Sequence, residues 1–290
     1  MTDDIHGLHH AGILTRNLDG LEHRYTALGF TLSPRSRHLL SAGPGQPPVP
    51  GCTANLCALF GDSYIELLGI VDDTAPDPWH TRSMADEYEG FRILNLETID
   101  AAATDHRLTE HGLPTSGVLD LARDIDTELG VRTVRARAVH IDPRSTPEGH
   151  LGLAQHLTRE YVHQPRYLDH ANGALGVAAV LIVAEDREFE GIVDRYSLIL
   201  GRPPYQKGPL TLLDAGSVQV ELVRATAAEE VLPGEPAPAA SYLAAMTIRV
   251  ADAVRARELV EAGGTATRGT SDGFFVSARD AFGAALFFTA

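Results

Sequence analysis

A unit that recurs four times along the chain constrains its fold more than any other feature. Each copy has an apolar strand, an acidic residue before an amphipathic helix, and a glycine where the helix ends. Aspartate accepts hydrogen bonds from the free N–H groups of a first helical turn, and glycine readily adopts the left-handed conformation that ends many helices. The acidic residues that open the four predicted helices are Asp19, Asp100, Asp186 and Asp252, and the glycines that end them are Gly29, Gly112, Gly201 and Gly263.

Strand-like sequence broken by turn signals follows each predicted helix. In the first copy the turn is Gly61-Asp62, and in the third it is Ala215-Gly216, each between apolar, strand-forming runs. Such a pattern predicts hairpins. Each copy is therefore interpreted as a βαβββ module, and the chain is predicted to be an α+β protein of four such modules. A long insertion, residues 120–132, is expected before the final hairpin of the second module.

The four modules are predicted to pair into two domains. The first domain, residues 1–160, holds modules one and two, and the second, residues 173–290, holds modules three and four. The segment 158–172 is interpreted as a linker in which His163 and His170 pack locally. The Pro- and Gly-rich stretch 43–51 is predicted to be a loop, with a position over the site as a further hypothesis.

Composition restricts the class of partner. The net charge of −15 disfavours nucleic acid and anionic membranes, because phosphate binding needs a basic surface. No stretch reaches 18 uninterrupted apolar residues, so no membrane span is predicted. The acidic N-terminus is unlike a signal peptide, and Cys52 and Cys57 are expected to be free thiols, which favours the cytoplasm. A small molecule is the expected partner, and a homodimer stays open.

Several segments of the chain resemble one known superfamily. They are 8–13 on the first predicted strand, 29–32 after the helix, 53–55, 60–61, 64–69, 155–158 and 172–174. In these segments the chain is similar to the glyoxalase/bleomycin-resistance/extradiol-dioxygenase superfamily, also called vicinal oxygen chelate, and to its glyoxalase-like branch. The resemblance implies that two modules close into a cup. It also implies one metal-ligand position on the first strand and one on the last strand of each module.

The residues at these positions differ between the two halves of the chain. Counting nine residues back from each helix-opening acid gives His10, Phe91, Val177 and Leu243 on the first strands. Counting forward from the turn glycines gives Glu66, His156, Glu221 and Phe288 on the last strands. Strand side chains alternate between faces, and this alternation favours His156 over its neighbour Gln155. The N-terminal half thus offers three residues of ligand type, and the C-terminal half offers one.

His10, Glu66 and His156 are therefore the predicted metal ligands, and His9 is expected to face away from His10. Two histidines and one carboxylate with vacant positions suit Fe(II), and they also accommodate Mn, Ni, Co or Zn. A carboxylate in an apolar strand, as at Glu66, needs a metal or a cationic partner. The predicted substrate-binding residues are Asn55, Tyr64 and Arg92, with Arg37 and His38 as further candidates for the wall of the cup.

The resemblance implies a divalent-metal-dependent enzyme whose small substrate chelates the metal through neighbouring oxygens. Two chemistries are open. A base removes a proton next to a metal-bound carbonyl, as in an isomerase or lyase, or Fe(II) acts with O2 as in a dioxygenase. The alternative is a metal-free protein that sequesters a small molecule, as the bleomycin-resistance relatives do. The catalytic base is not identified.

Overall fold

Four βαβββ modules follow one another in the computed structural model, which describes residues 4–40 and 43–290. Module one contains β1 (Ile5–Thr15), α1 (Leu18–Ala27), β2 (Ser36–Leu40), β3 (Val49–Leu59) and β4 (Tyr64–Ile70). After α2 (Thr81–Glu87), module two contains β5 (Gly90–Thr98), α3 (Ala101–Glu110), β6 (Thr115–Thr127), β7 (Gly130–Ile141) and β8 (His150–His156).

The second half of the chain repeats this order. After α4 (Arg159–Val162), module three contains β9 (Ala174–Ala184), α5 (Phe189–Leu200), β10 (Tyr205–Lys207), β11 (Leu210–Ala215) and β12 (Val218–Arg224). After α6 (Ala228–Val231), module four contains β13 (Tyr242–Val250), α7 (Ala253–Ala262), β14 (Arg268–Gly269), β15 (Gly273–Val276) and β16 (Ala285–Thr289). Within the described residues, no helix has the length and apolar character needed to cross a membrane.

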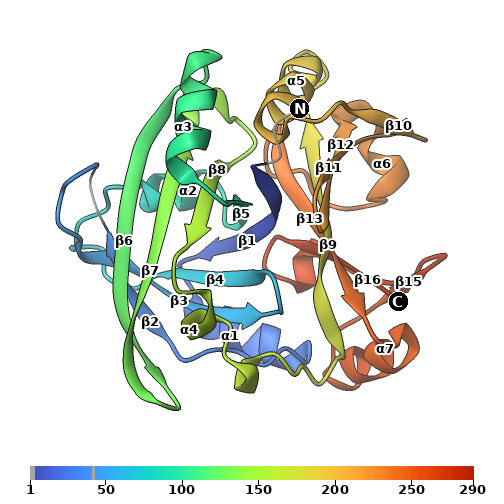
Figure 1. Cartoon of the computed structure of the whole chain (residues 1–290). Coiled ribbons are helices and arrows are strands. Elements are labelled where there is room, and N and C mark those ends of the chain that lie inside the picture. The colour runs from blue at the N-terminus through green and yellow to red at the C-terminus, as the bar shows by residue number, and fades with distance from the viewer. Residues whose placement is uncertain (1–3, 41–42) are drawn as a thin grey trace.

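Each half of the chain forms one eight-stranded mixed sheet, and the two sheets lie next to each other (Figure 1). The strand orders are β2-β3-β4-β1-β5-β8-β7-β6 and β10-β11-β12-β9-β13-β16-β15-β14. The first and last strands of a module pair in parallel, as β1 does with β4. The two modules of a half are joined by antiparallel pairing of their first strands, β1 with β5 and β9 with β13. The predicted α+β fold of four paired modules is confirmed, whereas the boundaries at 160 and 173 stay a prediction.

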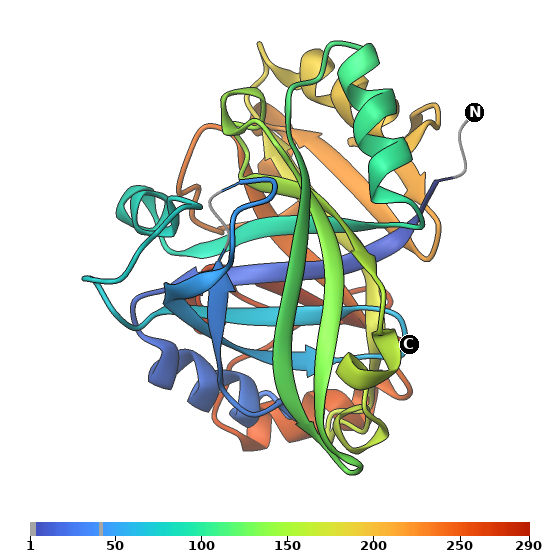
Figure 2. The ribbon, with the colours of Figure 1, turned by 60° about the vertical axis from the view of Figure 1, so that its left-hand side comes forward.

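The expected insertion at 120–132 lengthens the β6–β7 hairpin beyond its counterparts in the second half of the chain, β10–β11 and β14–β15. Strands β6 and β7 pair without interruption from Val118 opposite Val139 to Thr127 opposite Gly130. The sequence alternates here, and Asp120, Asp124 and Asp126 are exposed. Such alternation is what a half-buried antiparallel strand requires. Figure 2 shows this hairpin passing in front of the other strands of its sheet.

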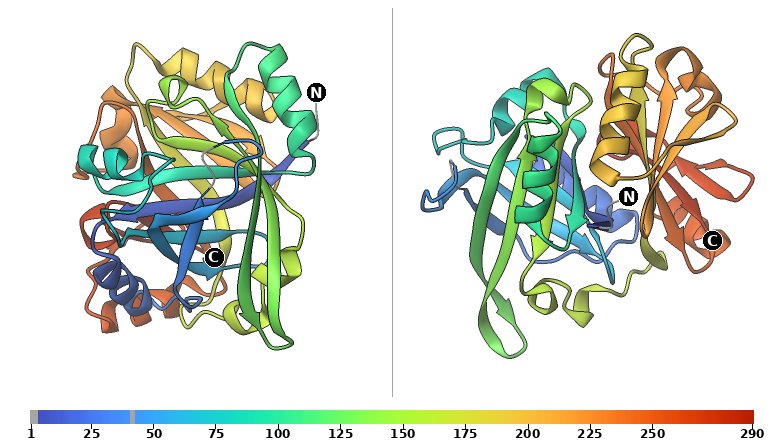
Figure 3. Two further views of the ribbon diagram at one scale, coloured as in Figure 1. Left: turned by 90° about the vertical axis from the view of Figure 1, so that its left-hand side faces the viewer. Right: turned by 45° about the horizontal axis from the view of Figure 1, so that its top comes forward.

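An apolar core lies between the two sheets and takes in the inner faces of the helices (Figure 3). Six apolar residues in or next to α1 and α5 are buried in it, namely Leu21, Tyr25, Leu28, Ile192, Tyr196 and Ile199. The start of α1 differs from prediction, because its N-cap is Asn17, whose side chain accepts a hydrogen bond from the Gly20 N–H. In α3 the predicted Asp100 is the N-cap. Because Asn17 lies two residues before Asp19, matching modules one and two at their helix N-caps pairs different residues from those matched in the sequence analysis.

The segment between the two halves packs on module one through its histidines, and not locally as expected. The Nδ1 of His163 lies 2.6 Å from the Phe60 carbonyl oxygen, and the Nε2 of His170 lies 2.9 Å from the Leu59 carbonyl oxygen. The predicted Pro- and Gly-rich loop is shorter than expected, because β3 begins at Val49.

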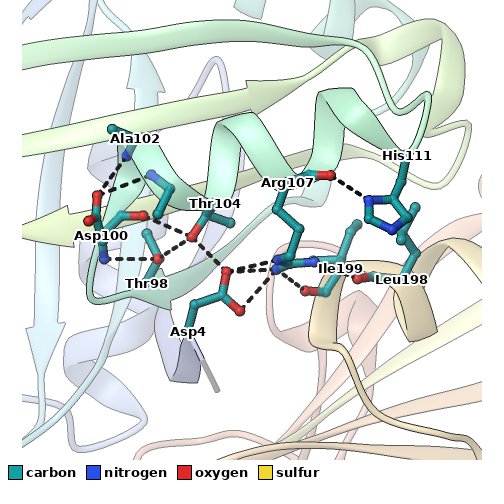
Figure 4. Close-up of polar contacts among 10 residues, drawn as sticks. Asp4, Thr98, Asp100, Ala102, Thr104, Arg107, His111, Leu198 and Ile199 are labelled. Atoms are coloured by element: carbon teal, nitrogen blue, oxygen red, sulfur yellow. Dashed lines mark hydrogen bonds and ion pairs between the residues drawn. The ribbon is translucent and has the colours of Figure 1, made fainter. Parts of the chain in front are cut away.

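A half-buried ion pair connects the N-terminal strand to helices of both halves (Figure 4). The Arg107 guanidinium on α3 donates to the Asp4 carboxylate at 2.8 Å, and also to the carbonyl oxygens of Leu198 and Ile199 at the end of α5. Burial alone would raise the pKa of Asp4, but the hydrogen bonds from Arg107 and Thr104 outweigh it and lower that pKa. Arg107 therefore holds module two against module three.

We expect Arg107→Gln to lower the free energy of unfolding at pH 7 by about 2 kcal/mol, because hydrogen bonds to charged groups are lost. The folded-state pKa of Asp4 lies below its ordinary value of 3.8. The contribution of this pair is therefore complete above pH 3.8 and is lost as the pH falls through the folded pKa. Urea unfolding at several pH values measures both effects. Arg255→Gln, at an exposed position on α7, is the control, and equal losses in the two variants would contradict the prediction.

Candidate functional site

A cavity opens on the concave face of the N-terminal sheet, and its wall is rich in histidine. All eight strands of the sheet, β1 to β8, contribute to it, and α2 contributes Thr81 and Met84. The histidines that line it are His9, His10, His38, His140, His150 and His156. His9 and His10 both face the cavity although they are adjacent, because the β1–β5 register shifts between Leu8 and His10. The expectation that His9 faces away is therefore wrong, since a bulge breaks the alternation of faces.

The carboxylate of Glu66 is the centre of the polar network in this cavity. Asn55 donates from Nδ2 to its Oε1 at 2.6 Å. The Nε2 of His38 lies 3.3 Å from Oε1, and the Nε2 of His10 lies 3.6 Å from Oε2. Burial would raise the pKa of Glu66, but the hydrogen bonds and the charges of His38 and His10 outweigh burial and lower it to about 2. Glu66 is therefore an ionised carboxylate in a buried position.

His10 lies between two polar neighbours. Burial is the largest cause that lowers the pKa of His10 to about 4, so its ring is neutral near pH 7. Its Nε2 lies 2.9 Å from Asn95 Nδ2, and its Nδ1 lies 2.8 Å from Nδ1 of His9. The Nε2 of His9 is a buried nitrogen with no hydrogen-bond partner in the described part of the chain.

His156 lies on the same wall, but the structure does not bring it to Glu66. Its ring stacks on His9 with 3.9 Å between ring centres, and its Nδ1 is 3.6 Å from Oε1 of Glu97. Of the neighbours His156 and Gln155, His156 lines the cavity, as predicted. Gln155 instead donates to the Ile99 carbonyl oxygen.

The strand register explains the distance between His156 and Glu66. In the antiparallel pairing of β1 with β5, His10 lies opposite Asn95 and Gly12 lies opposite Ile93. Exchanging the two modules turns one of these pairs into the other, so Ile93 occupies on β5 the position that His10 occupies on β1. The expected counterpart was Phe91, which instead packs in the apolar core. On the last strands Glu66 lies opposite Gly12, and Gly152 lies opposite Asn95. Gly152 is thus the counterpart of Glu66, and His156 lies four residues beyond it.

The three predicted substrate-binding residues are not all in the cavity. Asn55 and Tyr64 line it, and the Tyr64 ring stacks on His10 with 4.8 Å between ring centres. Arg92 is on the other face of β5, where it is buried, binds Glu87 and lies over the Tyr88 ring. Its placement in the cavity was wrong, because Ile93 and Asn95 occupy the cavity face of this strand. Arg37, a further candidate, instead binds Asp72.

Several cavity residues were not among the main site residues predicted from the sequence. His38 comes from a short edge strand and was named only as a wall candidate. His150 has the same strand parity as His156, so the alternation argument selects it equally well. The residues that were missed altogether are Asn95, Arg123, His140 and His150.

Donors suited to a divalent metal surround Glu66, although they are not closed around one point. Among residues 4–40 and 43–290, no three His, Cys, Asp or Glu side chains stand in an arrangement that could hold a metal ion. The chemistry of the donor set fits a metal nevertheless: His10 is neutral, Glu66 is ionised, and a second imidazole, His38, lies beside the same carboxylate. A neutral imidazole and an ionised carboxylate are the forms in which these side chains bind a metal.

Comparison with known proteins agrees with the architecture. The family model of a glyoxalase-like domain matches residues 8–196. A hypothetical protein from Staphylococcus aureus is 12% identical, with 97% of this chain and 98% of that chain covered and a TM-score of 0.66. A mutant of 4-hydroxymandelate synthase from Streptomyces coelicolor is 11% identical, with 99% and 93% covered and a TM-score of 0.62.

A fusion of a xylose isomerase-like TIM barrel with 4-hydroxyphenylpyruvate dioxygenase is 13% identical, and it covers 92% of this chain and 40% of its own, with a TM-score of 0.59. No curated protein sequence matched the chain. At these identities the solved structures support the fold alone. Because the family model matches well over half of its residues, the chain belongs to the glyoxalase-like family of the vicinal oxygen chelate superfamily.

Proposed function

We propose that the chain is a divalent-metal-dependent enzyme that acts on a small molecule in the cavity of its N-terminal half. The observation that carries the proposal is the buried, ionised carboxylate of Glu66 with two imidazole nitrogens beside its two oxygens. A buried charge is costly unless it is paired or binds a metal. Membership of the superfamily and the two dioxygenase- and synthase-like neighbours support the same reading.

In this proposal the metal is held by His10, Glu66 and His38. His38 takes the role that the sequence predicted for His156, because His38 lies beside Glu66 and His156 lies beside Glu97. Two imidazoles and one carboxylate suit Fe(II), Mn, Ni, Co or Zn. When bound, such a metal polarises oxygen atoms of a chelating substrate.

The residues around this group have separate roles. In this proposal His9 accepts the Nδ1 proton of His10, which leaves His10 Nε2 free to bind a ligand. Burial raises the pKa of Tyr64 well above its ordinary value, so its phenol stays protonated and can donate to a substrate oxygen. Isomerase or lyase chemistry and dioxygenase chemistry are both compatible with these residues, and comparing turnover with and without O2 separates them.

A metal-free binding protein is the second candidate, and one contact favours it. The Nδ2 of Asn95 lies 2.9 Å from His10 Nε2, where a metal would bind. Asn95 also fills the space beside Gly152, at which a Cβ atom would come within 2.2 Å of its Oδ1. Under the metal proposal Asn95 moves aside when the ion binds, and under the alternative it stays.

Metal analysis separates the two candidates. We expect the purified protein, incubated with Fe(II), Mn or Zn and then desalted, to retain about one ion per chain. His10→Ala, His38→Ala and Glu66→Ala should each lose it, whereas His156→Ala should keep it. His106→Ala, on the exposed face of α3, is the control, and circular dichroism checks that each variant is folded. Trace metal in the wild type and in every variant would refute the metal proposal, and loss in His156→Ala alone would restore the ligand set predicted from sequence.

The neutral state of His10 makes a separate prediction about pH. The folded pKa of His10 is about 4, below its ordinary value of 6.5, so the unfolded chain takes up the proton first. The stability that neutral His10 confers is complete above pH 6.5 and is lost as the pH falls towards 4. Glu66 stays ionised throughout this window, because its pKa is about 2.

We therefore expect the metal-free wild type to lose up to about 3 kcal/mol relative to His10→Gln between pH 6.5 and pH 4. Urea unfolding in the presence of a chelator measures the difference. His23→Gln, at an exposed position on α1, should show no such dependence relative to the wild type. A difference between wild type and His10→Gln that is independent of pH would mean that His10 is not held neutral.

A further inference from the structure

Arg123 on β6 stands in the wall between two cavities. It lines the histidine cavity and also a neighbouring cavity formed by the loop after α1, the β6–β7 hairpin and the segment after β8. Its guanidinium donates from Nη1 to Ser36 Oγ at 2.5 Å, which directs the side chain inward between β6 and β2. The side chain is half-buried. Arg123 is therefore held at the one residue position where β6 faces both spaces.

No carboxylate of the described residues forms an ion pair with Arg123. Four other buried or half-buried arginines do have such partners: Arg92 pairs with Glu87, Arg107 with Asp4, Arg159 with Glu97 and Arg195 with Glu148. Removing a guanidinium from water is costly unless an acceptor replaces the water. Arg123 thus keeps most of its five N–H donors for a group that is not part of the described chain.

The charges around the histidine cavity leave Arg123 available to an anion. Glu66 is already surrounded by His10, His38 and Asn55. The second cavity is bordered by Asp124 and Asp126, which repel an anion. An anion that binds Arg123 is consequently favoured on the histidine side.

The wall next to Arg123 is apolar. Leu121 and Ala122 precede it on β6, Val134 and Ala136 face it from β7, and Trp79 and Leu39 line the same cavity. Apolar surface of this kind takes the hydrocarbon or aromatic body of a ligand, while a few polar groups fix its orientation.

We propose that this cavity takes a small organic acid, and that Arg123 binds its carboxylate while the apolar body lies against the β6–β7 wall. The planar guanidinium suits this role, because it can form two parallel hydrogen bonds to a carboxylate. The inference deepens the proposed function by naming the substrate class of the same cavity. It depends on that cavity being the substrate site, but the binding itself needs no metal, so it is tested on chelator-treated protein.

The experiment is isothermal titration calorimetry of the whole metal-free chain with four probes. Phenylacetate and butyrate carry a carboxylate, and 2-phenylethanol and 1-butanol are their neutral counterparts. We expect the wild type to bind each acid at least about 10-fold more tightly than its alcohol, since hydrogen bonds to charged groups are strong. Arg123→Gln should lose about 10- to 100-fold in affinity for the acids and change little for the alcohols. Arg123→Lys, which keeps the charge, should lose less.

The matched control is Arg137→Gln on β7, an arginine that pairs with Asp120 on the outer surface of the same hairpin. It should bind the acids as the wild type does. Equal affinity of wild type and Arg123→Gln for both acids, or no preference of the wild type for acids over alcohols, would overturn the proposal. Because no metal is present, acid binding that depends on Arg123 stands even if metal analysis refutes the enzyme. If acid binding does not depend on Arg123, the proposal for the metal site is unaffected.

Discussion

The antiparallel pairing of β1 with β5 is the constraint on which the rest of the N-terminal half depends. It joins two modules into one sheet and sets His10 opposite Asn95 and Gly12 opposite Ile93. Parallel pairing then places β4 beside β1 and β8 beside β5, so that Glu66 and Gly152 follow at fixed positions. A bulge at Leu8 turns both His9 and His10 towards the cavity. The polar centre is therefore a consequence of register, to which all four strands contribute.

In this fold the surroundings of a glutamate determine the pKa of its carboxyl group. Glu66 and Glu221 both lie five residues after a turn glycine on the last strand of a module. Burial raises the pKa of Glu221, and the charge of Lys207 offsets that rise only in part. At Glu66 the hydrogen bonds and charges of His38 and His10 outweigh burial, and the pKa falls to about 2. The surroundings therefore favour the charged form at Glu66 and disfavour it at Glu221.

The repeat in the sequence was sufficient to predict the four modules, because helix caps, terminating glycines and hairpin turns are local signals. The site depends on register, which is not local. With Asp19 taken as the residue that opens α1, the module-two residue matched to His10 was Phe91. With the true N-cap, Asn17, the matched residue is Ile93. Alternation gave the correct face for His156 but could not say how far along β8 the site lies. His38 was undervalued because an edge strand of five residues carries little periodic signal.

The asymmetry of the cavity follows from the same register. Module one places His10 and Glu66 at its two ligand positions, and module two places Ile93 and Gly152 at the matching ones. Gly152 leaves space that Asn95 fills, so Asn95 lies against His10 from the module-two side. His38 on β2 and Arg123 on the β6–β7 hairpin also line this cavity. Under the proposed function, module one thus supplies the carboxylate and imidazoles that would hold a metal, and module two supplies the wall against which a ligand would lie.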